Sequence, residues 1–554
     1  MAASGAWLLV VPLLFMVFFY FFPLGKLVSI SLSQVSFSSH QAINWQIIKN
    51  GSGFTFYQAG LSTFFTILLG LPAAYVFGRF AFPGKNILRI ASTLPFILPT
   101  VVVAVGFNAL VGPSGLLNNG LMAVLGKSAP LINLQNTLAA IILAHVFYNT
   151  SIVIRVVGSA LAQQDRKLED AAQTLGASPW KTFTKVTFPL LLPAILSALL
   201  LVFLFDFTSF GVILMMGGPR FTTLEVEIFT QTMQFLNLPL AGLLSFIQLC
   251  FTLFVSLLLM KLGGSAMGSP VMPRLNQEGL REPARIWEKL LTGTMVFFLL
   301  TLLVSPILSL IVKSLQVPTS GGGYLWSLKY YRDLFVNRQL SLFYVPPVTA
   351  VWNSVRFAGV SAAVSLILGL LLAYGMLSFK NRKAVNLLML LPLGTSSVTL
   401  GLGFFTAFST MAGSQKWLGL LIPFAHALIS LPFVLRVVQP ALQSIPVNLK
   451  LAAQNLGTRP FGVFRFIELP IIWRALMTSA VYAFTISLGE FGATSFLSRP
   501  DLPTMPIAIY RYLNLPGSGN YGQALAMAVI ILAVCIISMA VLDKLQYNPQ
   551  TVRK

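Results

Sequence analysis

The chain has 554 residues, of which 56% are hydrophobic and only 9% are charged. A soluble domain carries about 25% Asp, Glu, Lys and Arg, so the composition excludes a soluble globular protein and indicates a polytopic membrane protein. Lys and Arg number 36 against 14 acids, giving a formal charge of +22. In a soluble protein this excess would suggest nucleic-acid binding, whereas in a membrane protein it orients the spans. Cys250 and Cys535 both lie in apolar runs, so no disulfide framework or Cys-based metal site is expected.

Apolar runs long enough to cross a bilayer recur along the chain. A helix needs about 20 residues to span the hydrocarbon core, and twelve runs meet this requirement. They cover 7–31, 55–79, 90–112, 135–158, 188–215, 240–261, 290–314, 352–378, 385–410, 417–439, 470–497 and 520–542. The first run lacks a basic start and a small-residue cleavage site, so we expect a retained helix.

Segment 263–288, between the sixth and seventh runs, is rich in Gly, Pro, Ser, Arg and Glu and has no apolar periodicity. Such a composition indicates a linker. The sequence therefore predicts an all-α polytopic membrane protein with two six-helix halves, 1–262 and 289–554, joined by a cytoplasmic linker at 263–288.

The distribution of cations predicts the orientation of the spans. With the N-terminus inside, the loops on the cytoplasmic side contain Arg79, Lys85, Arg166, Lys181 and Lys380 among others. Lys and Arg then favour the cytoplasmic side by roughly two to one, as expected from the positive-inside rule. We therefore expect a multi-pass protein of the plasma (inner) membrane with both termini in the cytoplasm.

The two halves are related by an internal repeat. At a shift of 281 residues, segment 143–161 (LAHVFYNTSIVIRVVGSAL) matches 424–442 (FAHALISLPFVLRVVQPAL), and the match continues to Phe491-Gly492. Around the third run the shift is 297, which indicates a longer outside loop in the first half. Because six spans return the chain to the same side, the halves form a parallel repeat about an axis along the membrane normal.

The best-matched polar segments are the cytoplasmic loops 165–189 and 445–470. The first reads D-A-A-x3-G-x9-V-x-F-P from Asp170, and the second reads L-A-A-x3-G-x9-I-x-L-P from Leu451. These loops resemble the E-A-A-x3-G-x9-I-x-L-P loop of permease subunits of binding-protein-dependent ABC importers, except that Leu451 replaces the acid in the second half. The resemblance covers nearly the whole chain and implies the type I importer permease fold. It also implies docking of an ATPase on Asp170, Ala171, Ala172, Gly176, Pro179, Trp180 and Phe183 in the first loop and on Ala452, Ala453, Gly457, Pro460, Phe461 and Phe464 in the second.

The residue types predict a helix, a tight turn and a second short helix in each loop. Ala pairs favour helix, Gly176 and Gly457 permit a left-handed turn, and a proline follows at the start of the next helix. Trp180 with Phe183, and Phe461 with Phe464, then form an aromatic patch at spacing i, i+3. The alternative is an amphipathic helix that lies in the headgroup layer, but two copies at one offset favour docking.

The chain encodes no ATP site of its own. The nearest phosphate-loop candidate, Gly120 to Ser128, has five residues between its glycines where the P-loop has four, and it lies in an outside loop. The resemblance therefore implies two separate ATP-binding cassette subunits that carry ATP and Mg, and an extracytoplasmic substrate-binding protein. We expect no bound cofactor or metal in this chain and no enzymatic activity. The expected partners are these proteins and membrane lipid, and no nucleic acid.

Two acids lie at membrane depth. An unpaired charge there costs at least about 2.5 kcal/mol, so Asp206 and Glu490 are candidate pathway residues. Asp206 aligns with Ser487 and Glu490 aligns with Ser209 at the shift of 281. In the resembling family these helices line the pathway, which implies two carboxylates suited to a cationic substrate. The alternative is that each carboxylate is hydrogen-bonded to neighbouring side chains such as Ser209 or Ser487.

His145 and His426 occupy equivalent positions of the repeat. Two histidines without a third ligand are a weak signal for a metal site, so we favour histidines that hydrogen-bond between helices.

Two segments following the Phe-Gly motifs, GGPRFTTLEVEIF and LSRPDLPTMPIAIY, resemble the ferric-iron and thiamine branch of fused importer permeases. We favour ferric iron as substrate, with thiamine or another small cation or solute as the alternative. The rival classes are an ion-coupled secondary transporter of the two-times-six type and a membrane-embedded enzyme. Segment 79–89 lacks the basic signature expected of the former, and the few His and acids argue against the latter.

Overall fold

The computed structural model describes residues 6–36, 45–263, 280–319, 323–336, 346–378, 385, 388–389, 391–409 and 419–546. Within these residues, eleven helices are long and apolar enough to cross a membrane. The remaining expected span, 385–410, contains a 12-residue apolar helix at Ser397–Phe408, and residues 386–387, 390 and 410 lie outside the described part. The prediction of an all-α polytopic fold is confirmed.

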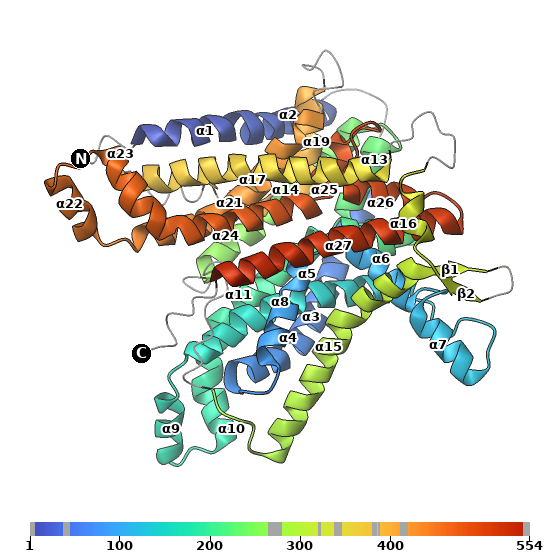
Figure 1. Ribbon diagram of the computed structural model, residues 1–554, viewed down its shortest axis with the longest axis horizontal. Helices are drawn as coiled ribbons and strands as arrows, with labels where there is room; N and C mark the ends of the chain where they lie inside the picture. The colour runs from blue at the N-terminus through green and yellow to red at the C-terminus, as the bar shows by residue number, and fades with distance from the viewer. Residues whose placement is uncertain are drawn as a thin grey trace. The chain divides into compact units, whose positions relative to one another are not determined.

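The described residues divide into two compact units, and Figure 1 labels many of their helices and strands. Unit 2 comprises 42–227 and 250–327, and unit 1 comprises 1–41, 228–249 and 328–554. Helices α13 (Leu224–Met233) and α14 (Leu238–Gly263) each contribute to both units.

Unit 2 is built mainly from the first half of the sequence. Its helices are α3 (Trp45–Arg79), α4 (Lys85–Ala91), α5 (Leu94–Ile97), α6 (Thr100–Val111), α7 (Leu116–Leu125), α8 (Leu138–Gln163), α9 (Lys167–Thr174), α10 (Pro179–Thr182), η3 (Phe183–Thr187), α11 (Phe188–Phe207), α12 (Gly211–Met216), η4 (Gly218–Arg220) and α15 (Ile286–Leu315). Strands β1 (Gln316–Pro318) and β2 (Tyr324–Trp326) pair antiparallel, with Gln316 opposite Trp326.

Unit 1 is built mainly from the second half. Its helices are η1 (Ala6–Leu9), α1 (Val10–Met16), η2 (Val17–Phe21), α2 (Phe22–Ser36), α16 (Lys329–Asp333), α17 (Pro347–Ser378), η7 (Leu391–Gly394), α19 (Ser397–Phe408), α21 (Ile422–Gln443), α22 (Val447–Asn455), α23 (Pro460–Val463), η8 (Phe464–Glu468), α24 (Leu469–Gly489), α25 (Gly492–Leu497), α26 (Met505–Leu513) and α27 (Ser518–Gln546).

The first helical segment of each half packs with the other half. Residues 6–36 belong to unit 1, where the Phe19 ring stacks on Phe424 at 5.0 Å and the Tyr20 hydroxyl lies 2.6 Å from Thr395 Oγ1. Helix α15 belongs to unit 2, where Gly106 of α6 allows the close approach of the Pro306 backbone. The predicted halves 1–262 and 289–554 therefore describe the repeat in the sequence, whereas the compact units exchange their first helices.

The internal repeat is visible in the helix boundaries. At the shift of 281, α10 superimposes on α23, η3 on η8 and α12 on α25, each with identical limits. At the shift of 297, α6 superimposes on α19. The third predicted span, 90–112, is interrupted in the structure because Pro99 stands immediately before α6, which begins at Thr100. A 12-residue helix is only about 18 Å long. In the first half, the candidate span Thr100–Leu125 therefore reaches a membrane-crossing length only together with α7, and in the second half the corresponding apolar helix is α19.

Close packing of a glycine against a valine recurs in both units. A Cβ on Gly70 would lie 2.8 Å from Val153 Cβ, and a Cβ on Gly369 would lie 2.6 Å from Val434 Cγ1. Val153 is fully buried in a cluster with Ala74, Val157 and other apolar residues. Small residues let membrane helices approach closely and gain packing energy, which explains why these two positions carry no side chain.

Gly369→Ala should therefore destabilise the protein by about 1–3 kcal/mol, because the new methyl group overlaps Val434. The matched control is Gly359→Ala in the same helix, where no atom lies within 4 Å of the added Cβ and Ala favours the helix by up to about 1 kcal/mol. Thermal unfolding in detergent measures both variants. Adding Val434→Ala to Gly369→Ala should recover part of the lost stability, because the overlapping methyl group is removed. Equal midpoints for Gly369→Ala and Gly359→Ala would contradict the packing argument.

A hydroxyl group from another helix caps α13 in the first half and its repeat counterpart α26 in the second. The backbone N–H of Leu224, at the start of α13, donates to Thr55 Oγ1 at 2.9 Å. The backbone N–H of Met505, at the start of α26, donates to Ser354 Oγ at 2.8 Å. A buried helix start leaves several N–H groups without intrahelical partners, so these two bonds fix equivalent helices in the two units.

Candidate functional site

Each half carries a helical hairpin at one end of a long helix. In Figure 1, α9 and α10 lie at one end of α11, and α22 and α23 lie at one end of α24. Gly176 has φ of 87° and Gly457 has φ of 82°, the left-handed conformation that glycine adopts without steric cost. The Ala177 N–H donates to the Ala172 carbonyl, and the Thr458 N–H donates to the Ala453 carbonyl, both at 3.0 Å. The predicted helix, turn and helix are thus confirmed in both loops.

The second helix of each hairpin begins with a proline. Pro179 occupies the first turn of α10, and the Lys181 N–H donates to the Ser178 side chain at 3.4 Å. Pro460 occupies the same place in α23 after Arg459. One π-helical segment, η3 or η8, then joins the hairpin to the membrane helix. Such segments are rare and often mark functional positions.

The hairpins expose apolar side chains. Trp180 is 72% exposed and Phe461 is 70% exposed, and each ring contacts the next aromatic residue, Phe183 or Phe464, at about 6 Å. Sequence reasoning missed the two most exposed large apolar side chains of the hairpins, Leu175 at 89% and Leu456 at 87%. Their shared position directly before the turn glycine was the signal that would have identified them.

The other predicted docking residues differ in how far they are exposed. Those that are exposed are Asp170, Ala171, Gly176, Pro179, Ala452, Gly457 and Pro460. Ala172, Phe183 and Phe464 are half-buried, and Ala453 is buried. The accessible surface of each hairpin is therefore the turn and the aromatic face, and the buried alanine packs the first helix against its own unit. Leu451, which replaces the motif acid, is 48% exposed.

The first helix of each hairpin forms an ion pair, through Glu169 in α9 and through the equivalent residue Lys450 in α22. In the first half, Glu169 of α9 pairs with Arg79 at the end of α3 and accepts a hydrogen bond from Thr187 at 2.7 Å. Burial, then the charges of Arg79 and Arg281, lower the pKa of Arg166, whose guanidinium donates to the Arg79 carbonyl at 3.3 Å. Position 169 corresponds to Lys450 in the second half.

In the second half the hairpin helix carries the cation, and its acidic partner lies in η8. Lys450 Nζ of α22 lies 2.6 Å from Glu468 Oε1, and Glu468 occupies the position equivalent to Thr187. The Tyr374 hydroxyl donates to Glu468 Oε2 at 2.5 Å. Both hairpins are thus held on their own unit by a charged contact, although the residue types differ.

Glu468→Gln should lower stability by about 3 kcal/mol or more, because it leaves the partly buried Lys450 ammonium without its counter-charge. The matched control is Asp501→Asn. The Asp501 side chain is 58% exposed and lies 3.0 Å from Arg499 Nε, so its loss should cost less than about 1 kcal/mol. Denaturant-induced unfolding of the purified protein compares the two. A larger loss in the Asp501 variant would refute the role of the hairpin ion pair.

Asp206 is fully buried within unit 2 and is surrounded by donors. Asn149 Nδ2 donates to Asp206 Oδ1 at 2.7 Å, and the Thr63 hydroxyl lies 3.4 Å from Oδ2. His145 Nδ1 lies 3.4 Å from Oδ1. The Gln58 side chain also donates to the Asp206 backbone carbonyl at 2.8 Å. These contacts hold the C-terminal end of α11 against α3 and α8.

Glu490 lies within unit 1 between α24 and α25, directly after Gly489. Its carboxylate accepts the backbone N–H groups of Ala493 and Thr494 at 2.8 and 3.0 Å and the Thr494 hydroxyl at 2.7 Å. His426 Nε2 lies 3.1 Å from Oε2. Glu490 thus caps α25 and joins it to α21.

In each half a histidine lies between the two positions that carry the acid in one half and a serine in the other, 206 and 209 in the first half and 487 and 490 in the second. His145 contacts Ser62 through Nδ1 at 2.9 Å and Ser209 through Nε2 at 2.8 Å. His426 contacts Ser487 through Nδ1 at 2.7 Å and Thr494 through Nε2 at 2.8 Å. The acid is therefore on the Nδ1 side in the first half and on the Nε2 side in the second, with a serine at the opposite position.

The histidines bond between helices, as expected. Among the described residues, no group of three or more His, Cys, Asp or Glu side chains is placed to hold a metal ion. The contacts of Asp206 and Glu490 are those of the hydrogen-bonded alternative, and a role for Asp206, Glu490, Ser209 and Ser487 in a substrate pathway stays a prediction.

Comparison with known proteins agrees with the hairpin geometry and the repeat. The family model described as binding-protein-dependent transport system inner membrane component matches residues 66–263 and 365–547. One matched segment falls in each half of the repeat, and each contains one hairpin.

Several relatives resemble the chain over most of its length. The thiamine transport system permease protein of Escherichia coli K12 is 26% identical over 517 residues, which cover 90% of this chain and 89% of the relative. The thiamine transport system permease protein of Haemophilus influenzae is 27% identical, covering 88% and 87%. A probable ABC transporter permease protein of Sinorhizobium fredii is 24% identical, covering 88% and 85%.

Proposed function

Because this chain belongs to the family of binding-protein-dependent transport system inner membrane components, and is a fused permease of an ABC importer, we propose that thiamine or a closely related organic cation is its substrate. The observation that carries the proposal is the full-length similarity to permeases that are named for thiamine transport. These relatives favour thiamine, the alternative in the sequence analysis, over ferric iron.

The two hairpins support a specific arrangement of partners. We propose that each hairpin receives one ATP-binding cassette subunit, so that one fused chain takes the place of two permease subunits. ATP and Mg belong to those partners, and a separate binding protein delivers the substrate at the opposite side. The hairpins then lie in the cytoplasm together with both termini, and the chain itself performs no hydrolysis.

Reconstitution of the chain with its ATPase and binding protein in proteoliposomes tests this proposal. ATP-dependent accumulation of radiolabelled thiamine is expected, with no accumulation of ferric iron. Iron uptake without thiamine uptake would overturn the thiamine assignment in favour of ferric iron. Uptake that needs an ion gradient and proceeds without the ATPase would overturn the importer interpretation in favour of a secondary transporter.

Glu490 offers a second, narrower test of the pathway. Glu490→Gln keeps one of the two oxygens that accept the Ala493 and Thr494 N–H groups and removes the negative charge. If Glu490 acts on a cationic substrate, uptake should fall about tenfold, corresponding to about 1.4 kcal/mol, whereas the amount of assembled complex stays the same. Unchanged uptake would reject the pathway role and leave Glu490 as the cap of α25.

A further inference from the structure

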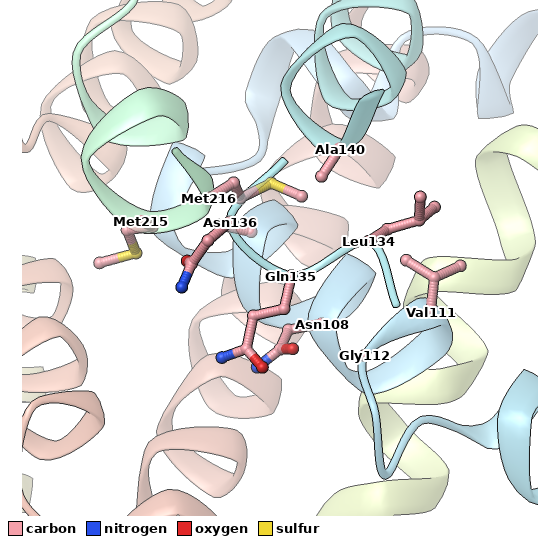
Figure 2. A pocket seen from close by; sticks show the side chains of 10 residues that line it. Asn108, Val111, Gly112, Leu134, Gln135, Asn136, Ala140, Met215 and Met216 are labelled. Atoms are coloured by element: carbon pink, nitrogen blue, oxygen red, sulfur yellow. The ribbon is translucent and has the colours of Figure 1, made fainter. Parts of the chain in front are cut away.

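A small pocket opens beside the C-terminal end of α6 in unit 2 (Figure 2). Three carboxamide side chains line it, those of Asn108, Gln135 and Asn136, together with Met215 and Met216, which lie beside Asn136. Asn136 and Gln135 are exposed, and Asn108 is half-buried. The pocket thus offers neutral donors and acceptors next to polarisable thioethers, and it is open to solvent.

The loop that carries two of these carboxamides is held at both ends. Fully buried Asn118 donates to the Gly112 and Ile132 carbonyls at 2.8 and 2.5 Å and accepts the Leu131 and Ile132 N–H groups. Thr137 caps α8 by accepting the Ala140 N–H and donates to the Leu134 carbonyl at 2.8 Å. A loop fixed in this way loses little entropy when a ligand binds.

The backbone at the pocket is in an unusual conformation. Asn136 has φ of 56°, and Asn is among the few non-glycine residues found in this region. A Cβ on Gly218 would lie 2.7 Å from Asn136 Cγ, so the carboxamide packs directly over a glycine. Strained backbone of this kind concentrates at ligand sites and switch regions.

The repeat shows that the polar lining is particular to the first half. At the shift of 297, Asn108 corresponds to Phe405, and at the shift of 281, Met215 corresponds to Phe496. Phe496 is buried in unit 1, where its ring contacts Phe229 at 5.8 Å. Two positions of the pocket, Asn108 and Met215, thus carry aromatic side chains in the second half.

We infer that this pocket recognises the aminopyrimidine ring of the substrate, an inference that rests on the proposed function. An aminopyrimidine presents an amino donor beside a ring-nitrogen acceptor, and the Asn or Gln carboxamide matches that edge with two hydrogen bonds, as it does with adenine. The Met thioethers are suited to contact the ring face. Helix α8 begins beside the pocket and ends at the hairpin, and its 26 residues span about 39 Å. The site therefore lies on the side where the binding protein delivers substrate.

The test measures the KM of uptake in the reconstituted complex for thiamine and for its analogue with oxygen in place of the ring amino group. Asn108→Leu and Gln135→Leu each remove one carboxamide. At least one of the two variants should raise the KM for thiamine about tenfold and reduce the preference for thiamine over the analogue, because the paired edge is lost. Asn108→Phe copies the second half and should do the same, which covers the case in which the Leu variant does not fold. The matched control is Asn119→Leu, since Asn119 is a half-exposed amide on α7 outside the pocket.

The outcomes separate the two proposals. If the wild-type complex carries thiamine and KM is unchanged in all folded pocket variants, the pocket inference is wrong and the proposed function stands. If the wild-type complex carries no thiamine, both fail. A rise in KM confined to the pocket variants, with Asn119→Leu at the wild-type value, supports the assignment.

Discussion

Replacing Trp180 and Phe461 together with Ala should abolish ATP-driven uptake. Both side chains are about seven-tenths exposed at equivalent positions of the two hairpins, and buried aromatic anchors typically contribute about 2 kcal/mol or more each to an interface. Each ATPase contact should therefore weaken at least about 30-fold. Co-purification of the ATPase with the tagged permease and uptake into proteoliposomes measure the two effects.

Trp352→Ala is the matched control, because Trp352 is 67% exposed and lies in α17 outside either hairpin. It should leave ATPase recovery unchanged. The single variants Trp180→Ala and Phe461→Ala should each retain part of the bound ATPase, since one hairpin remains intact. Normal uptake by the double variant would show that the aromatic faces rest in the lipid headgroups and do not dock a protein.

Adding Ser209→Glu to the destabilised variant Asp206→Ser should recover much of the lost stability, because position 209 is the equivalent of Glu490 in the second half. Asp206→Ser leaves the buried Asn149 amide without its acceptor, at a cost of about 1–3 kcal/mol. Ser209→Glu alone places a second carboxylate near Asp206 and should also destabilise. In the double variant, the carboxylate introduced by Ser209→Glu would face His145 as Glu490 faces His426, so much of the loss should be recovered.

Thermal unfolding of the wild type, both single variants and the double variant gives a double-mutant cycle. The expected coupling is about 1 kcal/mol or more in favour of the double variant. Additive losses would mean that the histidine does not accept an acid on either side, and that the two halves use their carboxylates in unrelated ways.

The spans, the repeat and the hairpins were predictable because each depends on local residue types. Apolar runs of sufficient length identify helices, and paired Ala, Gly and Pro residues identify the turns. The break before Thr100 could also have been predicted, since Pro99 is visible in the sequence. Hydropathy alone, however, predicted one continuous span over 90–112.

Other features depend on contacts that no local pattern encodes. The alignment of Asp206 with Ser487 and of Glu490 with Ser209 was evident, yet the histidine between them appears only when α8 and α21 are packed against their neighbours. The exchange of first helices was likewise hidden, because an apolar helix such as residues 7–32 carries no sign of which helices it will contact. The pocket beside α6 required the loop held by Asn118, whose bonds join residues up to 14 positions apart.

The placement of residues 6–36 in unit 1 also sets the order of assembly during synthesis. Tyr20 meets Thr395, 375 residues later in the chain, and at ribosomal rates of about 5–20 residues per second that partner emerges roughly 20–75 s afterwards. The first helix must therefore remain in the bilayer with lipid around its aromatic side until the second half is made. A helix of nearly continuous apolar residues, with no acid or internal ion pair to satisfy, is suited to that interval.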